Sequence, residues 1–527
     1  MHTPDWKKIP NASDHLKWYE NKGKLKLDFF LSIIFVGMVL NGFDGTIISR
    51  ILALDVWTED IGNPSASQIG VLNAVPYMSG FVVGPFITWL DSRYGRRWGL
   101  RFYGYTMIIG TVIGCVAGLD GVNGYGLFVT SRFIIGFGLA SFLMTSLIVV
   151  QEISHPRSRS IVAASWDSYW ILGSVIASFL IFGTSYIQNS WAWRIPYLVQ
   201  LPMAFYIVIG VQFVPETPRF LMAKGREDEA FKFFVDYHGN GNPNDELVLY
   251  EFDLLKKTLQ MEAENKEADW SMIIKNKGSL HRLSLAALMA FMTGLSGSSI
   301  VYYYYTEVLN LVGITDTTTQ TGIGAGLSMF TWFCQIAAVY LDKRIGKKTV
   351  LLWVWPTLLL GLIGMCVSSG VFANTGADSK SAGIATVAML WIYLGFFNFA
   401  NPVLYSYPAE VQTYSLRSKG LLVWNTLNQC MGVYATWVDV VALESIGYKY
   451  YIVYMPLVII QWCLAYRYMV ETHSYTLEEI TQAFDGPDAV VPIIDKIQSQ
   501  ELPAYDFKEP SVEDGLGVKA HIKPQVI

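Results

Sequence analysis

Long apolar runs dominate this chain and limit the folds that are open to it. Runs of about 20 residues, the length that crosses a bilayer as one helix, can be marked twelve times. The first six cover about 28–49, 69–90, 98–119, 125–150, 161–187 and 194–213. The other six cover about 284–312, 320–341, 349–373, 384–407, 420–443 and 449–469. Only 15% of the residues are charged, against about 25% in soluble domains. The pattern predicts an all-α integral membrane protein with twelve transmembrane helices in two bundles of six.

Three polar motifs occur in the same order in both halves, about 250 residues apart, and each lies at the end of an apolar run. The first copies are Asp-Ser-Arg-Tyr-Gly-Arg-Arg at 91–97, Glu152 with Arg159, and Pro-Glu-Thr-Pro-Arg at 215–219. The second copies are Asp-Lys-Arg-Ile-Gly-Lys-Lys at 342–348, Glu410 with Arg417, and Val-Glu-Thr-His-Ser at 470–474. An ordered repeat of this kind indicates a duplicated architecture.

Charge placement predicts the orientation and the division of the chain. Basic residues gather in the turns after the second, fourth and eighth runs, and the alternate turns are acidic. The positive-inside rule then places both termini and the central segment in the cytoplasm. The predicted parts are a cytoplasmic segment (1–27), a six-helix bundle (28–213), a linker with short helices (214–283), a second bundle (284–469) and a cytoplasmic tail (470–527), disordered beyond about 486.

Two ionisable residues inside apolar runs belong to different spans of the first half and carry opposite charges. Asp44 lies in the first run and Arg132 in the fourth. Charged groups at membrane depth are costly unless they are paired, and they usually mark ion or substrate pathways. A carboxylate that faces an arginine changes its interactions on protonation, so the pair is a candidate for coupling proton binding to a conformational change.

The ordered motifs resemble the sugar porter family of the major facilitator superfamily, and within it the fungal lactose-permease-like, hexose and cellodextrin transporters. The resemblance runs from about residue 18 to 486. Besides the repeated motifs, its carriers are Gly-Phe-Asp at 42–44, Arg132-x-x-x-Gly-x-Gly to 138, Trp-Arg-Ile-Pro-Tyr-Leu-Val-Gln at 193–200, and Tyr-Pro-Ala-Glu at 407–410. The resemblance implies a secondary transporter that moves a sugar or sugar-like polyol by alternating access, with proton symport.

The resemblance also implies roles for the charged motif residues. Carboxylate–guanidinium pairs at the inner face would hold the cytoplasmic side shut in one state and separate in the other. The implied gate residues are Asp91, Arg96, Arg97, Glu152, Arg159, Glu216, Arg219, Asp342, Arg344, Glu410, Arg417 and Glu471. The alternative is a set of basic turns that only determine topology. Asp44 is the implied proton acceptor and Arg132 its counter-charge, the alternative being a static ion pair.

The expected substrate cavity departs from the family pattern. Asp167 stands where the fungal relatives have Asn, Thr293, Gly294, Ser298 and Ser299 replace amides, and Tyr405 replaces a Trp. Fewer amides remove hydrogen-bonding groups and leave room for a bulkier, less polar or cationic substrate. The candidate substrate residues are Asp167, Trp170, Gln200, Ser298, Ser299, Tyr302, Tyr303, Asn398, Tyr405 and Asn425. Asp167 has the alternative of pairing with a basic group, and each aromatic that of ordinary packing.

Other classes of function fit less well. An importer or exporter of a specialised metabolite on the same fold is the main alternative, and a nutrient sensor is disfavoured by the short tail. An enzyme is not expected. No phosphate-binding Gly-x-x-x-x-Gly-Lys loop is present, and neither metal-ligand spacing nor a nucleic-acid patch is seen. We therefore expect no metal or cofactor. The expected partners are a small-molecule substrate, protons and the lipid bilayer, with a monomer in the plasma membrane.

Overall fold

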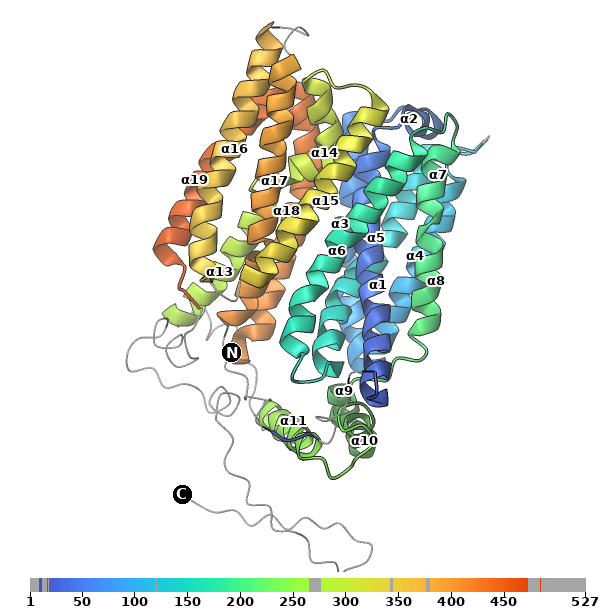
Figure 1. Cartoon of the computed structure of the whole chain (residues 1–527), viewed down its shortest axis with the longest axis vertical. Helices are drawn as coiled ribbons and strands as arrows, with labels where there is room; N and C mark the ends of the chain where they lie inside the picture. Colours follow the sequence, from blue (N-terminus) through green and yellow to red (C-terminus); the bar gives the residue numbers. More distant parts are fainter. Residues whose placement is uncertain are drawn as a thin grey trace, which may run out of the picture.

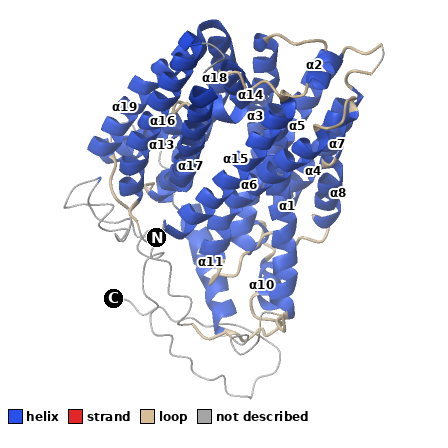
Figure 2. Ribbon diagram, turned by 45° about the horizontal axis from the view of Figure 1, so that its top comes forward, coloured by secondary structure: helices blue, strands red, loops and turns tan. Residues whose placement is uncertain are grey.

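The computed structural model describes residues 9–11, 17, 19–119, 121–264, 276–341, 345–375, 380–412, 414–472 and 484. Every regular element in these ranges is helical, with loops between the helices (Figure 2). The predicted disorder beyond residue 486 lies outside the described residues.

The helices of the N-terminal half form a bundle, and three short helices follow it. The bundle contains α1 (Lys22–Ile51), α2 (Asp55–Ile61), α3 (Ala66–Tyr94), α4 (Arg96–Val116), α5 (Gly124–Ile153), α6 (Arg159–Thr184), α7 (Trp191–Leu198) and α8 (Gln200–Gly210). The short helices are α9 (Pro218–Ala223), α10 (Glu227–Tyr237) and α11 (Glu246–Glu264). Side chains cap several starts, as where Asn21 accepts the N–H of Lys24 and Ser65 forms a capping box with Gln68.

The C-terminal half repeats the pattern. It contains α13 (Lys277–Gly294), α14 (Ser298–Leu311), α15 (Thr317–Leu341), α16 (Lys347–Thr375), α17 (Lys380–Glu410), α18 (Tyr414–Ile446), the 3₁₀ turn η2 (Gly447–Tyr450) and α19 (Tyr451–Tyr468). Figure 1 shows the two halves side by side, with α9, α10 and α11 beneath the N-terminal half and α2 at the other end. We call these ends the linker end and the far end.

Eleven helical stretches among the described residues are long and apolar enough to cross a bilayer. The last stretch, Lys419–Tyr468, has 50 residues, which at 1.5 Å per residue greatly exceeds a hydrocarbon core of about 30 Å. It contains both α18 and α19, separated by η2, and therefore supplies two crossings. The prediction of twelve transmembrane helices is confirmed.

The duplication visible in the motifs is also visible in the packing. In the first half α4 packs on α5 and α8, α1 on α6, and α3 on α5. In the second half α16 packs on α17 and α19, α13 on α18, and α15 on α17. Between the halves α3 contacts α18, and α15 contacts α6. Each half thus uses the same helix pairs, and the two halves meet through equivalent helices.

The outer surface of the bundle is apolar, as a bilayer requires. Large apolar side chains are exposed on several helices, including Val82 on α3, Tyr340 on α15, Trp353 and Leu360 on α16, and Ile384 on α17. Soluble proteins rarely expose so much contiguous apolar surface. These faces therefore fit contact with lipid.

One membrane crossing is divided into two helices. α13 ends at Gly294 and α14 begins at Ser298, with a non-helical segment between them. Gly297 caps the start of α14 at φ +93°, and a Cβ added there would lie 3.2 Å from Cγ of Tyr454. The left-handed conformation and the close ring favour glycine at this position. The chain therefore bends between α13 and α14, and the two helices do not form one continuous helix.

Replacing Gly297 by Ala is expected to destabilise the protein by about 1–2 kcal/mol, because the left-handed conformation is unfavourable for a residue with a Cβ. Gly183→Ala is the matched control, since a Cβ at Gly183 meets nothing within 4 Å. Thermal unfolding of the detergent-solubilised variants checks this. An equal melting temperature for both variants would contradict it.

Candidate functional site

Asp44 and Arg132 form a buried ion pair in the N-terminal half. Nη1 of Arg132, on α5, donates to both carboxylate oxygens of Asp44, on α1, at 2.9 and 2.8 Å. Asp44 is fully buried and Arg132 is 4% exposed. A charge at this depth requires a partner, and each residue supplies it for the other. The structure thus brings together the two residues that the sequence singled out.

Helix α1, which carries Asp44, is in direct backbone contact with α6. A Cβ on Gly42 would lie 1.8 Å from the carbonyl oxygen of Trp170, and a Cβ on Gly173 would lie 2.0 Å from that of Val39. The two glycines therefore let α1 and α6 touch through their backbones. Nε1 of Trp170 also donates to Oδ1 of Asn41 at 3.1 Å. A shift of α1 at the ion pair therefore also displaces α6.

Asp167 lies on α6 at the contact between the two halves. Its Oδ2 accepts hydrogen bonds from Nε2 of Gln335 on α15, at 2.9 Å, and from Nδ2 of Asn401 on α17, at 3.3 Å. Both partners are neutral amides from the opposite half. Among the described residues, Asp167 therefore has two amide partners and not the basic partner of the alternative interpretation.

Aromatic residues from both halves adjoin Asp167. One turn further along α6, Trp170 meets the ring of Tyr302 edge to face, with centroids 6.4 Å apart. The hydroxyl of Tyr302 donates to Oδ1 of Asn398 at 2.8 Å. Tyr303 hydrogen-bonds to Tyr77 across the halves. Four of the predicted substrate residues, Asp167, Trp170, Tyr302 and Asn398, thus come together at one place between the halves.

Tyr405 is also close to this place, since it interacts electrostatically with Asp167 and Tyr302, and the remaining predicted substrate residues are dispersed. Gln200 is fully buried within the N-terminal half, and its amide has no hydrogen-bond partner among the described residues. Tyr405 packs edge-on against Trp424, with centroids 5.2 Å apart, and Asn425 is half-buried one residue further along α18. Ser298 and Ser299 lie at the start of α14, where Ser299 donates to Asp439.

A buried arginine that the sequence prediction missed joins the halves near the far end. Arg50, at the end of α1, is 5% exposed. Its Nε donates to Ser178 on α6 and its Nη2 to Ser328 on α15, both at 3.2 Å. Its guanidinium lies 4.0 Å from the ring centre of Tyr305 on α14. The sequence did contain a signal for this residue. Arg50 lies at the end of the first apolar run that the positive-inside rule places outside, where basic residues are not expected.

The repeated Glu-Thr motifs cap helices at the linker end. Glu216 accepts the N–H of Arg96 at 2.9 Å, at the start of α4. Glu471 accepts the N–H groups of Lys347 and Lys348 at 2.9 and 3.1 Å, at the start of α16. Carboxylates are favourable at helix N-termini, where free N–H groups point outward. Burial raises the pKa of Glu216, and the N–H donors only partly oppose this.

Several of the described gate residues interact within their own half. Asp91 accepts the hydroxyl of Thr145 at 2.6 Å and lies 3.8 Å from Arg96. Arg97 donates to the carbonyl of Gln212 at 2.7 Å, beyond the end of α8. In the C-terminal half Lys347 pairs with Glu410. Arg219 lies in α9. The side chains of Asp342, Arg344 and Arg417 lie outside the described residues.

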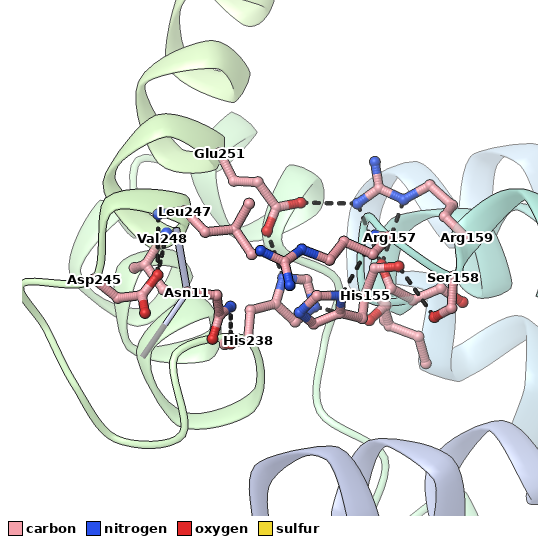
Figure 3. A network of polar contacts seen from close by, with 12 residues as sticks. Asn11, His155, Arg157, Ser158, Arg159, His238, Asp245, Leu247, Val248 and Glu251 are labelled. Atoms are coloured by element: carbon pink, nitrogen blue, oxygen red, sulfur yellow. Dashed lines mark hydrogen bonds and ion pairs between the residues drawn. The ribbon is translucent and has the colours of Figure 1, made fainter. Parts of the chain in front are cut away.

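Arg159 pairs with the linker rather than with Glu152. Its Nη2 lies 3.0 Å from Oε1 of Glu251 on α11, and Oε2 of Glu251 contacts Nδ1 of His238 at 2.5 Å. Figure 3 shows Glu251 between the Arg159 guanidinium and the His238 ring. Burial alone would raise the pKa of Glu251, but His238 and Arg159 together hold it below its ordinary value. Oε2 of Glu152 is buried without a partner among the described residues.

Hydrogen bonds between the halves extend from the far end to the middle of the bundle. Near the far end Asn73 donates to Tyr304 at 3.1 Å, and Ser178 bonds Ser328 at 2.8 Å. The contact nearest the linker end is that of Asp167. At the linker end, the Arg96–Asp91 and Lys347–Glu410 pairs each lie within one half, and the Arg159–Glu251 pair joins the N-terminal half to the linker. The halves are therefore tied together at the far end.

Acidification is expected to destabilise the contact between the N-terminal half and the linker, where His155 lies beside His238. Burial lowers the pKa of His155, next to His238, to about 3, so the folded protein leaves it neutral while the unfolded chain protonates it near pH 6.5. Stability therefore falls as the pH drops below about 6.5, by at most about 2 kcal/mol at pH 5 from this group. His155→Asn is expected to flatten the fall in melting temperature between pH 7 and 5, whereas His281→Asn, which removes a half-buried histidine in the C-terminal half, should not. Identical pH profiles for all three proteins would refute this.

The chain resembles known transporters over most of its length. A family model described as "Sugar (and other) transporter" matches residues 30–484. Hexose transporter HXT10 of Saccharomyces cerevisiae is 25% identical over 432 residues, which cover 79% of this chain and 75% of that protein. A low-affinity glucose transporter of Kluyveromyces lactis is 25% identical over 412 residues, covering 75% and 70%.

Solved structures show the same fold. The xylose transporter XylE from E. coli, in a partially occluded inward open conformation, matches with a TM-score of 0.71 and 17% identity, covering 86% of this chain and 100% of that one. The proton:xylose symporter XylE bound to 6-bromo-6-deoxy-D-glucose matches with a TM-score of 0.69 and 18% identity, covering 88% and 100%. The twelve helices therefore have the major facilitator arrangement. Because the family model covers most of the sequence, this chain belongs to the sugar transporter family.

Proposed function

We propose that this protein is a secondary active transporter that moves a sugar or sugar-like polyol together with a proton by alternating access between its two halves. The observation that carries the proposal is a continuous line of contacts. It runs from the Asp44–Arg132 pair through Asn41 on α1 to Trp170 on α6, and from there to Tyr302 in the other half. The line connects a proton acceptor to the place where the candidate substrate residues meet.

Protonation of Asp44 supplies the coupling. A neutral carboxyl no longer balances the charge of Arg132, and the two hydrogen bonds from Nη1 weaken because they lose their charge assistance. α1 is then free to move relative to α5. Because Gly42 and Trp170 are in backbone contact, that movement shifts α6 and the aromatic face that Trp170 presents to Tyr302.

The proposed orientation places the linker end in the cytoplasm and the protein, as a monomer, in the plasma membrane. In the described conformation the halves are bonded at the far end, which supports a state closed to the outside. The described gate residues that pair within one half or with the linker would exchange these partners for partners in the opposite half when the inner side closes. Glu152, whose Oε2 is buried without a partner among the described residues, is the first candidate for such an exchange.

The substrate is proposed to bind where Asp167, Trp170, Tyr302 and Asn398 meet. A polyol offers many hydroxyl donors and flat apolar faces, which suit a carboxylate, an amide and two aromatic rings. The substrate hydroxyls would replace Gln335 and Asn401 as donors to Asp167. Since the partners of Asp167 are neutral, a specialised metabolite with a cationic group is the second candidate.

Uptake by proteoliposomes under an imposed pH gradient tests the proposal. The panel includes mono- and disaccharides, polyols and amine-bearing analogues. The wild-type protein is expected to concentrate a sugar or polyol inside the vesicles. Asp44→Asn is expected to lose concentration entirely while retaining exchange of labelled for unlabelled substrate, because the substrate residues remain but the proton acceptor is gone.

Asp28→Asn is the matched control, since Asp28 is an exposed carboxylate on the same helix. It should accumulate substrate as the wild type does. Accumulation by Asp44→Asn under the pH gradient would refute proton coupling at Asp44, and exclusive uptake of the amine-bearing analogues would favour the second candidate.

A further inference from the structure

A second carboxylate is buried in the C-terminal half, far in the sequence from the Asp44–Arg132 pair. Asp439 lies on α18, seven residues before that helix ends at Ile446 at the far end. It is fully buried. Three hydroxyl groups donate to it, those of Ser299 on α14, Tyr450 in η2 at 2.9 Å and Tyr454 on α19 at 2.5 Å.

The surroundings of Asp439 contain donors but no cation. Asp439 forms no ion pair with any other described residue. Titratable groups on the elements packed around it include Tyr304, Glu307, Tyr393, Tyr434, Glu444, Lys449, Tyr450 and Tyr454, of which Tyr304, Tyr393, Tyr450 and Tyr454 interact electrostatically with Asp439. Of these, Glu444 and Lys449 are exposed. An ionised carboxylate only accepts hydrogen bonds, whereas a neutral carboxyl must also donate one. Three converging hydroxyl donors therefore fit the ionised form.

The carboxylate joins three elements that would otherwise be held together only by packing. Ser299 lies in the first turn of α14, directly after the non-helical segment that separates α14 from α13. Tyr450 and Tyr454 follow the end of α18. Asp439 on α18 thus binds the start of α14 to η2 and α19.

α14 also contacts the N-terminal half. It packs against α1, Tyr304 accepts a hydrogen bond from Asn73 on α3, and Tyr303 bonds Tyr77 on the same helix. Tyr304 donates in turn to the carbonyl of Thr436 on α18. A helix that lies between the halves and is bent away from its predecessor is able to move when the far end opens.

We propose that Asp439 is a second proton-binding carboxyl of the transport cycle, which holds α14 closed when it is ionised and releases it when a proton arrives from the far side. The proton comes from the aqueous phase and bonds to one carboxylate oxygen, and no other bond forms or breaks. The three hydroxyl donors then lose their charge assistance. This inference rests on the proposed function, because it assumes alternating access with the far end outside.

Opening of the far end is the property to measure. Labels on cysteines introduced at Glu59 and Thr315, which are exposed at the far ends of the two halves, report the distance between the halves by electron–electron double resonance. In the wild-type protein, acidification from pH 7.5 to 5 is expected to increase the population with the longer distance. The measurement is made both with native Asp44 and in the Asp44→Asn variant, where any remaining pH dependence cannot come from Asp44.

Single hydroxyl deletions keep the carboxyl and test its donors one by one. Ser299→Ala, Tyr450→Phe and Tyr454→Phe each remove one donor, so the midpoint of the opening transition is expected to move about 0.5–1 pH unit upward. Tyr451→Phe is the matched control, because the hydroxyl of Tyr451 is buried without a hydrogen-bond partner among the described residues. Its midpoint should equal that of the parent protein.

Asp439→Asn in the Asp44→Asn background gives the decisive result. It is expected to abolish the remaining pH dependence of the distance distribution. Persistence of that dependence, or equal midpoints for the three hydroxyl deletions and Tyr451→Phe, would overturn the proposal. Failure of the proposed function would appear separately, as absence of uptake driven by a pH gradient in the wild-type protein.

Discussion

The buried ion pair between Asp44 and Arg132 is the constraint on which the N-terminal half depends. Neither charge is stable alone at membrane depth, so α1 and α5 must stay in register for as long as both are ionised. Ser131, beside Arg132, bonds the hydroxyl of Tyr197 at 2.9 Å and the carbonyl of Gly110 at 2.7 Å, which adds α7 and α4 to the same cluster. One proton added to Asp44 therefore changes the balance of forces on four helices.

The two halves share one architecture but use buried charge differently. Equivalent helices pack on one another, and equivalent glutamates, Glu216 and Glu471, cap equivalent helices. The N-terminal half pairs its buried carboxylate with a guanidinium. The C-terminal half surrounds Asp439 with hydroxyl groups and places it next to the break between α13 and α14. Duplication explains the common frame, and the differences lie where the proposed coupling and gating occur.

The sequence predicts the helices better than it predicts their side-chain partners. Twelve apolar runs and three repeated motifs are local patterns, and they sufficed for the fold class. The Asp44–Arg132 pair was also predictable, because an anion in the first apolar run and a cation in the fourth each need a partner of opposite charge at membrane depth. Asp439 also lies in a predicted span, the eleventh. The free-energy cost of an ionisable group at membrane depth marks it in the same way.

Long-range partners required the structure. Arg159 pairs with Glu251, which lies 92 residues away on a linker helix, and no spacing rule connects them. The amide partners of Asp167 come from two helices of the other half, so its environment depends on how the halves dock. The bend before α14 had a local signal in Gly294 and Gly297, but only the backbone shows that the helix divides there. The boundaries of the two bundles and the linker remain predictions.

Direct measurement of protons exchanged on substrate binding tests the coupling claim with the fewest assumptions. Detergent-solubilised protein in weakly buffered solution is mixed with a transported sugar while a pH indicator is followed. We expect a substrate-linked pH change for the wild-type protein that Asp44→Asn lacks, although the variant still binds the sugar. A pH change of equal size in both proteins would contradict the claim that Asp44 is the proton acceptor.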